Sequence, residues 1–457
     1  MMTMHIVIVG NGVAGTEAAL EVRRRAPDAR ITVVSEETDH FFSRTALMYV
    51  AIGQMAHKDI EPLERDVYER MKLQRVRARA TGVDLDKRKL LLAGGKEPLA
   101  YDKLLLCCGS RPRPAPWEGS GDLLGVGHLV TMQDLHWFTR ELWGSEGHDQ
   151  PERPWAHLDA STDDSPYRRR KTAAEVRGRP AEKACVVGGG LIGIESIEVM
   201  AAKGVKPTFL IREEAFWPIA LDGTEAAWIA EELRHHGVDV RLQESITAVH
   251  GDDSGCITSV DTDKGSIDTD LLMVAIGVMP QTGWLEDSGL ELEERSRGIV
   301  VDERLQTSDP HVWAAGDCAA VRWFNGWVRP EQLWYTGRDQ GRVAAASLLG
   351  SEARYARGTW YNSAKLMDIE YTTVGLVNMG VDGEENWFHQ EQGRVRSTTR
   401  LVHKDGVLIG FNALGRRWDH SILARWIEEK RSLAWVKANL NHARFDTEFV
   451  PPLQLPA

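Results

Sequence analysis

The sequence has no excess of positive charge and no long hydrophobic run. Of its 457 residues, 55 are Lys or Arg and 67 are Asp or Glu, which gives a formal net charge of -12. Nucleic-acid binding needs a basic face, so this balance argues against nucleic acid as a main partner. No apolar run approaches the roughly 20 residues of a membrane-spanning helix. The first predicted strand starts so near the N-terminus that a secretion signal has no space, and a cytoplasmic location is therefore expected.

Cysteine is scarce, and its spacing carries no known motif. None of the five cysteines forms a C-x-x-C pair or a zinc-ligand spacing, so no metal site is predicted. Most of them are expected to be small buried apolar side chains. Their positions are Cys107, Cys108, Cys185, Cys256 and Cys318.

Glycine, by contrast, is concentrated at two strand-to-helix turns. The apolar run Ile6 to Val9 stops at Gly10, and Gly12 and Gly15 follow at the spacing that opens a helix in nucleotide-binding folds. The first glycine makes the turn, the second lets the backbone approach a pyrophosphate, and the third allows close helix packing. Val13 and Ala14 begin the helix, whose free N–H groups and positive dipole end would face the phosphates.

The strand that follows this first helix ends in two carboxylates, Glu36 and Glu37. A carboxylate at that place accepts hydrogen bonds from an adenosine ribose in nucleotide-binding folds. These two residues are therefore candidates for holding the ribose of a bound dinucleotide.

A second unit of the same kind runs from Lys183 to Arg212. It contains Gly188, Gly190 and Gly193 at the same spacing, with Leu191 and Ile192 opening the helix. A single such fingerprint also occurs without a nucleotide, and a repeated one is more specific. The repeat predicts either two bound nucleotides or one nucleotide site and a degenerate copy.

Five motifs in order then resemble a known family. The motifs GxGxxG, YDKLLLCCGSRP, GGGLIGIE, LLMVAIGVMP and HVWAAGDCA are similar to those of the two-dinucleotide flavoproteins. That superfamily contains glutathione reductase, the ferredoxin and rubredoxin reductases and the flavin module of nitrite reductase, and the chain most resembles the cysteine-free members. The resemblance implies FAD in the first site and NADPH or NADH in the second. It implies an α/β fold of two Rossmann-like dinucleotide-binding domains plus a C-terminal α+β domain.

The resemblance also implies a domain layout. Residues 1–115 and 290–350 are expected to build the FAD domain, residues 116–289 the NAD(P)H domain, and residues 351–457 a C-terminal domain that supports a homodimer. The polar stretch 144–183 is longer than a domain crossing needs. It is either a surface excursion or a docking element whose cationic patch, residues 168–171, faces an acidic redox partner.

Several residues receive chemical roles from the resemblance. Thr45 stands where disulfide reductases carry a cysteine, and a threonine cannot form a mixed disulfide, so a thiol relay is disfavoured. Asp317 matches the aspartate that holds the flavin ribityl chain, and Glu195 matches a glutamate near the nicotinamide. Glu331 matches a position near the nicotinamide or the flavin edge. Trp334 lies where aromatic side chains suit a planar acceptor such as a quinone, although helix packing explains it equally well.

The remaining cofactor-binding positions follow from the same resemblance. Arg44 is expected to reach the FAD pyrophosphate or the isoalloxazine, and a surface ion pair is its alternative. The others are Ser43, Ala80, Cys108, Gly109, Arg111, Gly277 and Gly316.

The choice between NADPH and NADH depends on the end of the second strand of the second unit. The carboxylate position of NAD enzymes is Ile211 here, and Arg212 follows, which favours the 2′-phosphate of NADPH. Glu213 and Glu214 come next and keep NADH open, because a shift of one residue would place a carboxylate on the ribose.

These features predict an FAD-dependent NAD(P)H oxidoreductase that passes electrons to a separate acceptor without a redox-active disulfide. The acceptor is expected to be a ferredoxin- or rubredoxin-type protein or a small quinone. One alternative is a thiol, disulfide or peroxide reductase. Another is a redox-sensing interaction protein that turns over slowly.

Overall fold

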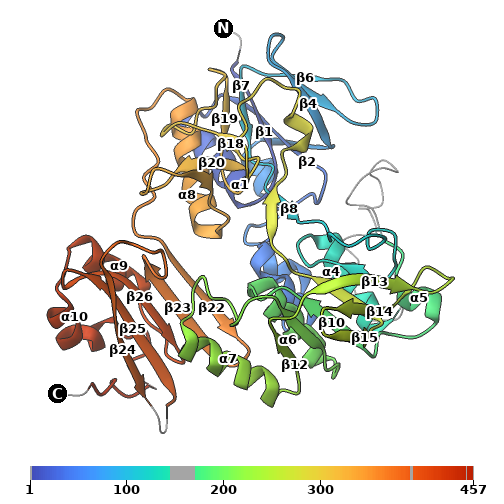
Figure 1. Ribbon diagram of the computed structural model, residues 1–457. Coiled ribbons are helices and arrows are strands. Elements are labelled where there is room, and N and C mark those ends of the chain that lie inside the picture. Colours follow the sequence, from blue (N-terminus) through green and yellow to red (C-terminus); the bar gives the residue numbers. More distant parts are fainter. Residues whose placement is uncertain (1–2, 145–169, 392–394, 449, 456–457) are drawn as a thin grey trace.

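The computed structural model describes residues 3–144, 170–391, 395–448 and 450–455, and its framework is two parallel β-sheets and one antiparallel sheet (Figure 1). The first parallel sheet has the strand order β19-β7-β1-β2-β3. Its central strands are buried, apolar runs, as expected for a parallel sheet that is covered on both faces. The strands are β19 (Val312–Ala314), β7 (Lys103–Leu106), β1 (His5–Val9), β2 (Arg30–Ser35) and β3 (Leu73–Arg77).

The second parallel sheet repeats this arrangement with the order β12-β11-β10-β16-β9. Its members are β12 (Asp239–Leu242), β11 (Thr208–Ile211), β10 (Ala184–Val187), β16 (Leu271–Val274) and β9 (Val126–Gly127). The chain leaves the first sheet after β7, builds the second sheet, and returns to pair β19 with β7. The two Rossmann-like sheets confirm the predicted fold class. The return of the chain supports the predicted domain layout, whose boundaries stay a prediction.

Short antiparallel pieces complete the two units. Strand β8 (Ser110–Pro112) pairs with β17 (Val278–Pro280), so both chain crossings between the sheets run side by side. The other pieces are β4 (Ala80–Asp84), β5 (Lys89–Leu92), β6 (Leu99–Ala100), β13 (Ile246–Gly251), β14 (Ile257–Thr262), β15 (Gly265–Asp268), β18 (Ile299–Val300), β20 (Ala319–Arg322) and β21 (Val328–Pro330).

Helices α1 (Val13–Arg25) and α8 (Trp334–Leu348) pack closely against each other beside the first sheet. Small residues allow this approach. A Cβ atom added to Gly341 of α8 would lie 2.3 Å from the backbone oxygen of Ala14 in α1, so no larger residue fits without a shift. The helix that opens the first glycine turn is therefore fixed by a helix more than 300 residues later in the chain.

The segment after β2 crosses from the first sheet to the second. It contains the helical turns 44–46 and 57–60, the helix α2 (Leu47–Ala51), and then α3 (Val67–Arg70). Leu47 and Val50 share one apolar core with Ile194 and Ile197 of α6 (Leu191–Ala202). This packing brings the predicted chemical position Thr45 to the unit that carries the second nucleotide turn.

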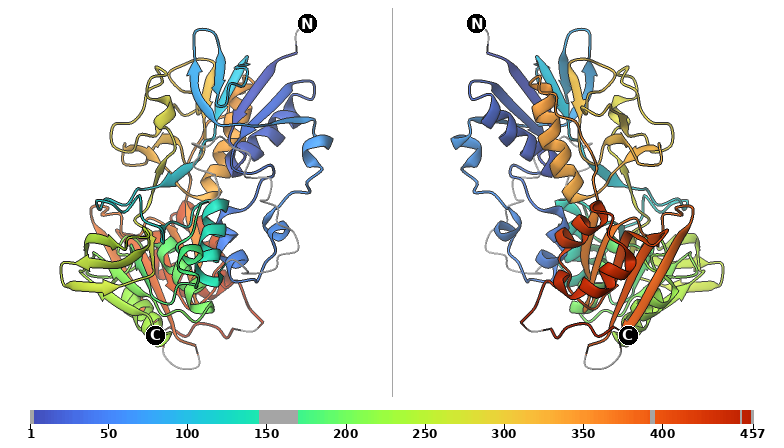
Figure 2. Two further views of the ribbon diagram at one scale, coloured as in Figure 1. Left: turned by 90° about the vertical axis from the view of Figure 1, so that its right-hand side faces the viewer. Right: turned by 90° about the vertical axis from the view of Figure 1, so that its left-hand side faces the viewer.

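The C-terminal unit is an antiparallel sheet with helices on one face. The strand order is β22-β23-β26-β25-β24, and Figure 2 shows the red helices α9 and α10 against these strands. Phe411 and Leu401 of the sheet share a core with Leu423 and Val436 of the helices. The elements are β22 (Tyr361–Leu366), β23 (Ile369–Gly375), β24 (Glu384–Glu391), β25 (Ser397–Lys404), β26 (Val407–Leu414), α9 (His420–Glu428) and α10 (Leu433–Asn439).

A buried ion pair fastens this C-terminal sheet to the second unit. The guanidinium of Arg400, 2% exposed, lies 3.0 Å from the carboxylate of Glu225 in α7 (Gly223–His235), and it donates a second hydrogen bond to the backbone oxygen of Ala220. Burial raises the pKa of Glu225, and Arg400 opposes that effect. The pairing is required because an unpaired buried charge costs several kcal/mol, roughly 3–5 when one partner is removed.

The predicted polar insertion 144–183 is described only in part. Arg168 and Arg169 of the predicted cationic patch lie outside the described residues. Arg170 points inward: its guanidinium donates to the backbone oxygen of Val126 at 2.8 Å and lies 4.7 Å from the ring centroid of Trp137 in α4 (Met132–Trp143). The insertion then continues into the short helix α5 (Ala173–Arg177).

The contact between α1 and α8 predicts a stability difference between two glycine substitutions. Gly341→Ala forces a Cβ against the Ala14 carbonyl, and overpacking of this kind costs about 1–3 kcal/mol. Gly223→Ala, at the start of α7, meets no atom within 4 Å and should leave stability unchanged or slightly higher. Thermal unfolding of both variants tests this. Equal melting temperatures for the two would contradict the close approach.

Candidate functional site

The first glycine turn has the geometry of a phosphate cradle. Gly10 has φ +109°, and a Cβ atom there would lie 2.0 Å from the backbone oxygen of Cys107. A Cβ atom on Gly15 would lie 2.0 Å from the oxygen of Gly10, whereas one on Gly12 would meet nothing within 4 Å. Two glycines are therefore needed for packing, and the middle one faces open space at the N-terminus of α1. That space suits a ligand phosphate, which the helix N–H groups would bind.

The second turn has the same three environments. A Cβ atom on Gly188 would lie 2.3 Å from the oxygen of Ala275, and one on Gly193 would lie 2.3 Å from the oxygen of Gly188. A Cβ atom on Gly190 meets nothing within 4 Å, in front of α6. The repeat in the sequence is thus a repeat in geometry, and both copies keep room for a phosphate.

The two carboxylates after β2, Glu36 and Glu37, differ in their hydrogen-bond partners. Glu36 is buried, and its Oε2 atom has no hydrogen-bond partner within the described structure. The carboxylate of Glu37 accepts hydrogen bonds from both terminal nitrogens of Arg44, at 2.9 and 2.6 Å. It also accepts one from the backbone N–H of Met132. The oxygen that awaits a partner is therefore on Glu36, which fits a ribose hydroxyl.

Arg44 is consequently tied to the protein. Besides Glu37, its guanidinium donates to the backbone oxygen of Val130, and it lies 5.0 Å from the ring centroid of Phe42. The structure therefore supports the ion-pair alternative for Arg44. Its predicted contact with FAD stays a prediction.

Asp317 lies where strands β7 and β19 end side by side. It directly follows Gly316, whose backbone N–H donates to Oε1 of Gln340 at 2.8 Å. Burial raises the pKa of Asp317, and a hydrogen bond from Ser110 and the charge of Arg44 oppose that rise. The carboxylate, with Gly109 and Gly316 beside it at φ +69° and +80°, faces the same edge of the sheet as the first glycine turn.

Glu331 belongs to a buried network next to this edge. Its Oε2 atom accepts hydrogen bonds from Tyr355 at 2.5 Å and from Gln340 at 3.2 Å, and its Oε1 atom pairs with Arg357. Burial raises the pKa of Tyr355, so the phenol is the donor. Because Gln340 also holds Gly316, the network fixes the position of Asp317. The predicted contact of Glu331 with a cofactor stays a prediction.

Glu195 lies on α6, one helical turn before Glu198. Burial raises the pKa of Glu195 to about 8, with the charge of Glu198 adding to the effect. Burial also raises the pKa of Glu198 to about 7, although its carboxylate accepts the backbone N–H of Met367 at 2.8 Å. Tyr49 of α2 is close enough that both carboxylates raise the pKa of its phenol, after burial. These groups form a site that holds protons near neutral pH.

The predicted chemical residue Thr45 is exposed, and its hydroxyl lies 3.2 Å from that of Ser43. The sequence has no cysteine between residues 1 and 106, so no cysteine is near Thr45 along the chain. Arg212 follows β11 directly. Its side chain is 81% exposed and lies 3.0 Å from the carboxylate of Glu213. An exposed arginine at this place is available to a phosphate.

The other predicted residues surround the two turns. Val13, Ala14, Leu191 and Ile192 form the first turns of α1 and α6, and Cys108 follows β7. Arg111 lies in β8, Ala80 begins β4, Gly277 has φ +100° after β16, and Trp334 opens α8 with its ring 5.5 Å from that of Tyr335.

Four polar residues of this region were not predicted from the sequence: Tyr49, Ser110, Glu198 and Gln340. Ser110 had a local signal, because it follows the close-approach position Gly109. Glu198 and Tyr49 take their roles from partners far along the chain, as when Glu198 accepts from Met367 169 positions later. Gln340 instead contacts Glu331 nine positions earlier and Gly316 24 positions earlier. No local pattern marks such residues.

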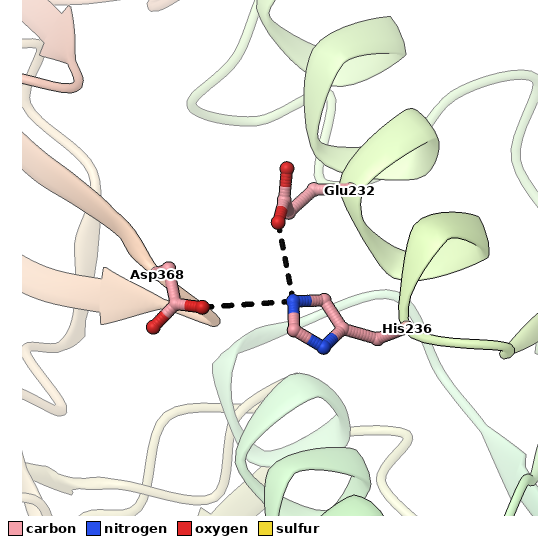
Figure 3. Close-up of side chains that lie close together, drawn as sticks. All are labelled: Glu232, His236 and Asp368. Carbon is pink, nitrogen blue, oxygen red and sulfur yellow. Dashed lines mark hydrogen bonds and ion pairs between the residues drawn. The ribbon is translucent and has the colours of Figure 1, made fainter.

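One cluster of side chains in the described part of the chain has the spacing of a metal site. The Nε2 atom of His236 lies 3.1 Å from a carboxylate oxygen of Glu232 and 3.6 Å from one of Asp368 (Figure 3). The two carboxylates account for the placement of the imidazole between α7 and the β22–β23 turn. Exposed polar contacts of this kind contribute little, about 0–1 kcal/mol.

Comparisons with known proteins agree with this geometry. The family model described as pyridine nucleotide-disulphide oxidoreductase matches residues 4–341. A ferredoxin–NAD(P)(+) reductase from Sphingomonas sp is 28% identical over 431 residues, covering 93% of this chain and 93% of that protein. A rubredoxin–NAD(+) reductase from Pseudomonas putida is 26% identical over 422 residues, covering 89% and 98% respectively.

Among solved structures, the covalent putidaredoxin reductase–putidaredoxin complex matches with a TM-score of 0.76 at 21% identity, covering 94% of each chain. At that identity the likeness shows the fold. No helix in the described residues is both long and apolar enough to cross a membrane.

The raised pKa of Glu195 predicts a pH-dependent stability. The folded protein keeps a proton on this carboxyl up to about pH 8, whereas the unfolded chain releases it near the ordinary glutamate pKa of 4.5. The folded state therefore loses relative stability as pH rises from 4.5 to 8. Glu195→Gln removes the titrating group, so its melting temperature should fall less between pH 5.5 and 8.5 than that of the wild type. Exposed Glu97→Gln is the matched control. Parallel curves for wild type and Glu195→Gln would refute the assignment.

Proposed function

Because the chain belongs to the pyridine nucleotide-disulphide oxidoreductase family, whose members use FAD and NADH or NADPH, we propose that it passes electrons from NAD(P)H through FAD to a separate acceptor. The acceptor in this proposal is an iron–sulfur or rubredoxin-type protein, and no redox-active disulfide takes part. The observation that carries the proposal is the pair of glycine turns. Each has two glycines held against backbone and a middle glycine that faces open space.

The residues around the first turn fit FAD. Gly12 leaves room for the pyrophosphate, the unpartnered Oε2 atom of Glu36 accepts a ribose hydroxyl, and Asp317 meets the ribityl chain. When bound, FAD accepts a hydride from the nicotinamide and releases two electrons to an acceptor. The chain positions the two nucleotides and sets the local charge. Glu195 keeps its proton near neutral pH and so adds no negative charge beside the nicotinamide.

A thiol relay does not fit the chain. Thr45 stands where the resemblance implies the relay cysteine, and four of the five cysteines are buried, among them Cys107 and Cys318 just after β7 and β19. Burial raises the pKa of Cys107 and Cys185, which keeps these thiols protonated, whereas a hydrogen bond with Cys108 lowers the pKa of Cys318. Direct transfer from flavin to the acceptor is therefore the better explanation than disulfide or peroxide reduction.

The named relatives support a protein acceptor. They are reductases of ferredoxin and rubredoxin, and a solved relative is covalently joined to putidaredoxin. A small quinone is the second candidate acceptor. Slow turnover as a redox sensor has no feature in its favour among the described residues, and most of the polar stretch on which it depends lies outside them. A homodimer through the C-terminal sheet stays a family expectation.

The preferred nicotinamide cofactor in this proposal is NADPH. Arg212 stands directly after β11 and is largely exposed, so it can pair with a 2′-phosphate. Glu213 competes for the same guanidinium, which weakens but does not remove the preference.

The two open glycines predict two separable defects. Gly12→Val should fold normally, because a Cβ atom added there meets no other part of the protein within 4 Å, but it should lose FAD at least tenfold more readily than the wild type. Gly190→Val should keep FAD and instead raise the KM for NADPH at least tenfold. Flavin absorbance after purification and anaerobic reduction by NADPH distinguish the two variants. Wild-type protein that binds no flavin on reconstitution would refute the proposed function.

The cofactor preference is tested by a reciprocal pair of substitutions. Arg212→Leu should raise the KM for NADPH about tenfold or more, because a charge-assisted hydrogen bond contributes about 1.5–3 kcal/mol. Glu213→Gln should lower the KM for NADPH, because the guanidinium of Arg212 then pairs with the 2′-phosphate without competition from Glu213. The KM for NADH should change little in both variants. A wild-type preference for NADH, or equal effects on both cofactors, would contradict the NADPH assignment.

A further inference from the structure

The hairpin formed by β20 and β21, residues 319–330, has large apolar side chains exposed at its turn. Phe324 is 55% exposed and Trp327 is 63% exposed, and they stand three positions apart. Exposed aromatic side chains that cluster on one turn mark interaction sites, because water around them is released on binding. We call residues 319–330 the aromatic hairpin.

The aromatic hairpin is held in one shape. The ring of Trp323 lies between two guanidinium groups, with the central carbon of Arg329 at 4.0 Å and that of Arg357 at 3.9 Å from its centroid. The backbone N–H of Trp323 donates to the oxygen of Trp327 at 2.7 Å. A turn that is fixed before binding loses little conformational entropy when a partner docks.

This hairpin is connected to the flavin edge by short contacts. Glu331 comes directly after β21 and pairs with Arg357, which also covers Trp323. The next residue, Gln332, donates to the hydroxyl of Ser110 at 2.9 Å, and Ser110 hydrogen-bonds Asp317. The base of the hairpin therefore lies at the edge where FAD is held, and the turn with Phe324 and Trp327 is at the other end of β20 and β21.

The charge of the hairpin favours an acidic partner. Residues 319–330 contain Arg322 and Arg329 and no carboxylate, in a chain whose net charge is -12. Arg322 is exposed, and Arg329 stacks on Trp323. A second copy of this chain, docked through the same hairpin, would bring like arginines together across the two-fold axis. An enclosed pocket would suit a quinone better than this open turn.

We propose that the aromatic hairpin is the docking surface for an acidic iron–sulfur protein that accepts the electrons, with Trp327 and Phe324 as its apolar anchors and Arg322 as its charged rim. This inference rests on the proposed function. One NAD(P)H supplies a hydride, two oxidised iron–sulfur proteins each accept one electron in turn, and one proton is released. Anchors of this type, a tryptophan beside an arginine, carry most of the free energy in many protein interfaces.

The test compares Phe324→Ala/Trp327→Ala with Phe445→Ala, an equally exposed aromatic residue elsewhere. The probes are putidaredoxin and rubredoxin, and the FAD-loaded enzyme is titrated with each by calorimetry. We expect the double variant to weaken binding of the better probe at least tenfold and Phe445→Ala to leave it unchanged. Arg322→Glu should weaken binding at low salt, and the loss should shrink as salt screens the charges. Reduction of bound flavin by NADPH and turnover with ferricyanide should be unaffected in all three variants.

Three results would overturn the docking proposal: equal affinities for wild type and the double variant, no binding of either probe to a wild type that NADPH reduces, and conversion of a dimer to a monomer by the double variant. The last would make the hairpin an interface between copies. If NADPH fails to reduce the wild-type flavin, the proposed function itself fails, which is a different outcome.

Discussion

The close approach of backbone to backbone at Gly10 and Gly15 is the constraint on which the rest of the structure depends. It presses α1 against the end of β7 and leaves the N-terminus of α1 open between β1 and β2. Helix α8 then closes over α1 because Gly341 has no side chain. These contacts fix the edge of the sheet where Asp317, Gly109 and Glu36 converge, and the same constraint recurs at Gly188 and Gly193 in the second unit.

The buried glutamates of this site differ in charge and in hydrogen bonding because their neighbours differ. Glu37 and Glu331 are neutralised by arginines, so they hold the structure together. Glu36 keeps an oxygen without a partner and is ready for a ligand. Glu195 has no cation among its principal neighbours, and burial therefore leaves it protonated near neutral pH. The role of each glutamate at this site thus depends on whether an arginine pairs with it, and not on the residue type alone.

The sequence was sufficient for those features that are local. The strand–glycine–helix turns and the strand end at Glu36 depend on neighbours close in the sequence, and the structure has the turns as predicted. The fold class and the position of Asp317 were expected from the resemblance of five motifs to a known family. Contacts between distant segments were not predictable. Examples are the hydrogen bond from the backbone of Met132 to Glu37, 95 positions away, and the hydrogen bond from Met367 to Glu198. The stacking of Trp323 between two arginines likewise requires that β20, β21 and residue 357 be brought together by the fold.

The central claim is that electrons leave the flavin directly, with no thiol pair between it and the acceptor. Anaerobic titration of the FAD-loaded enzyme with dithionite measures how many electrons it accepts per flavin. Because Thr45 stands where the family resemblance implies the relay cysteine, we predict two electrons per FAD and no long-wavelength thiolate–flavin absorbance. Uptake of four electrons per FAD would show a redox-active disulfide and contradict the account.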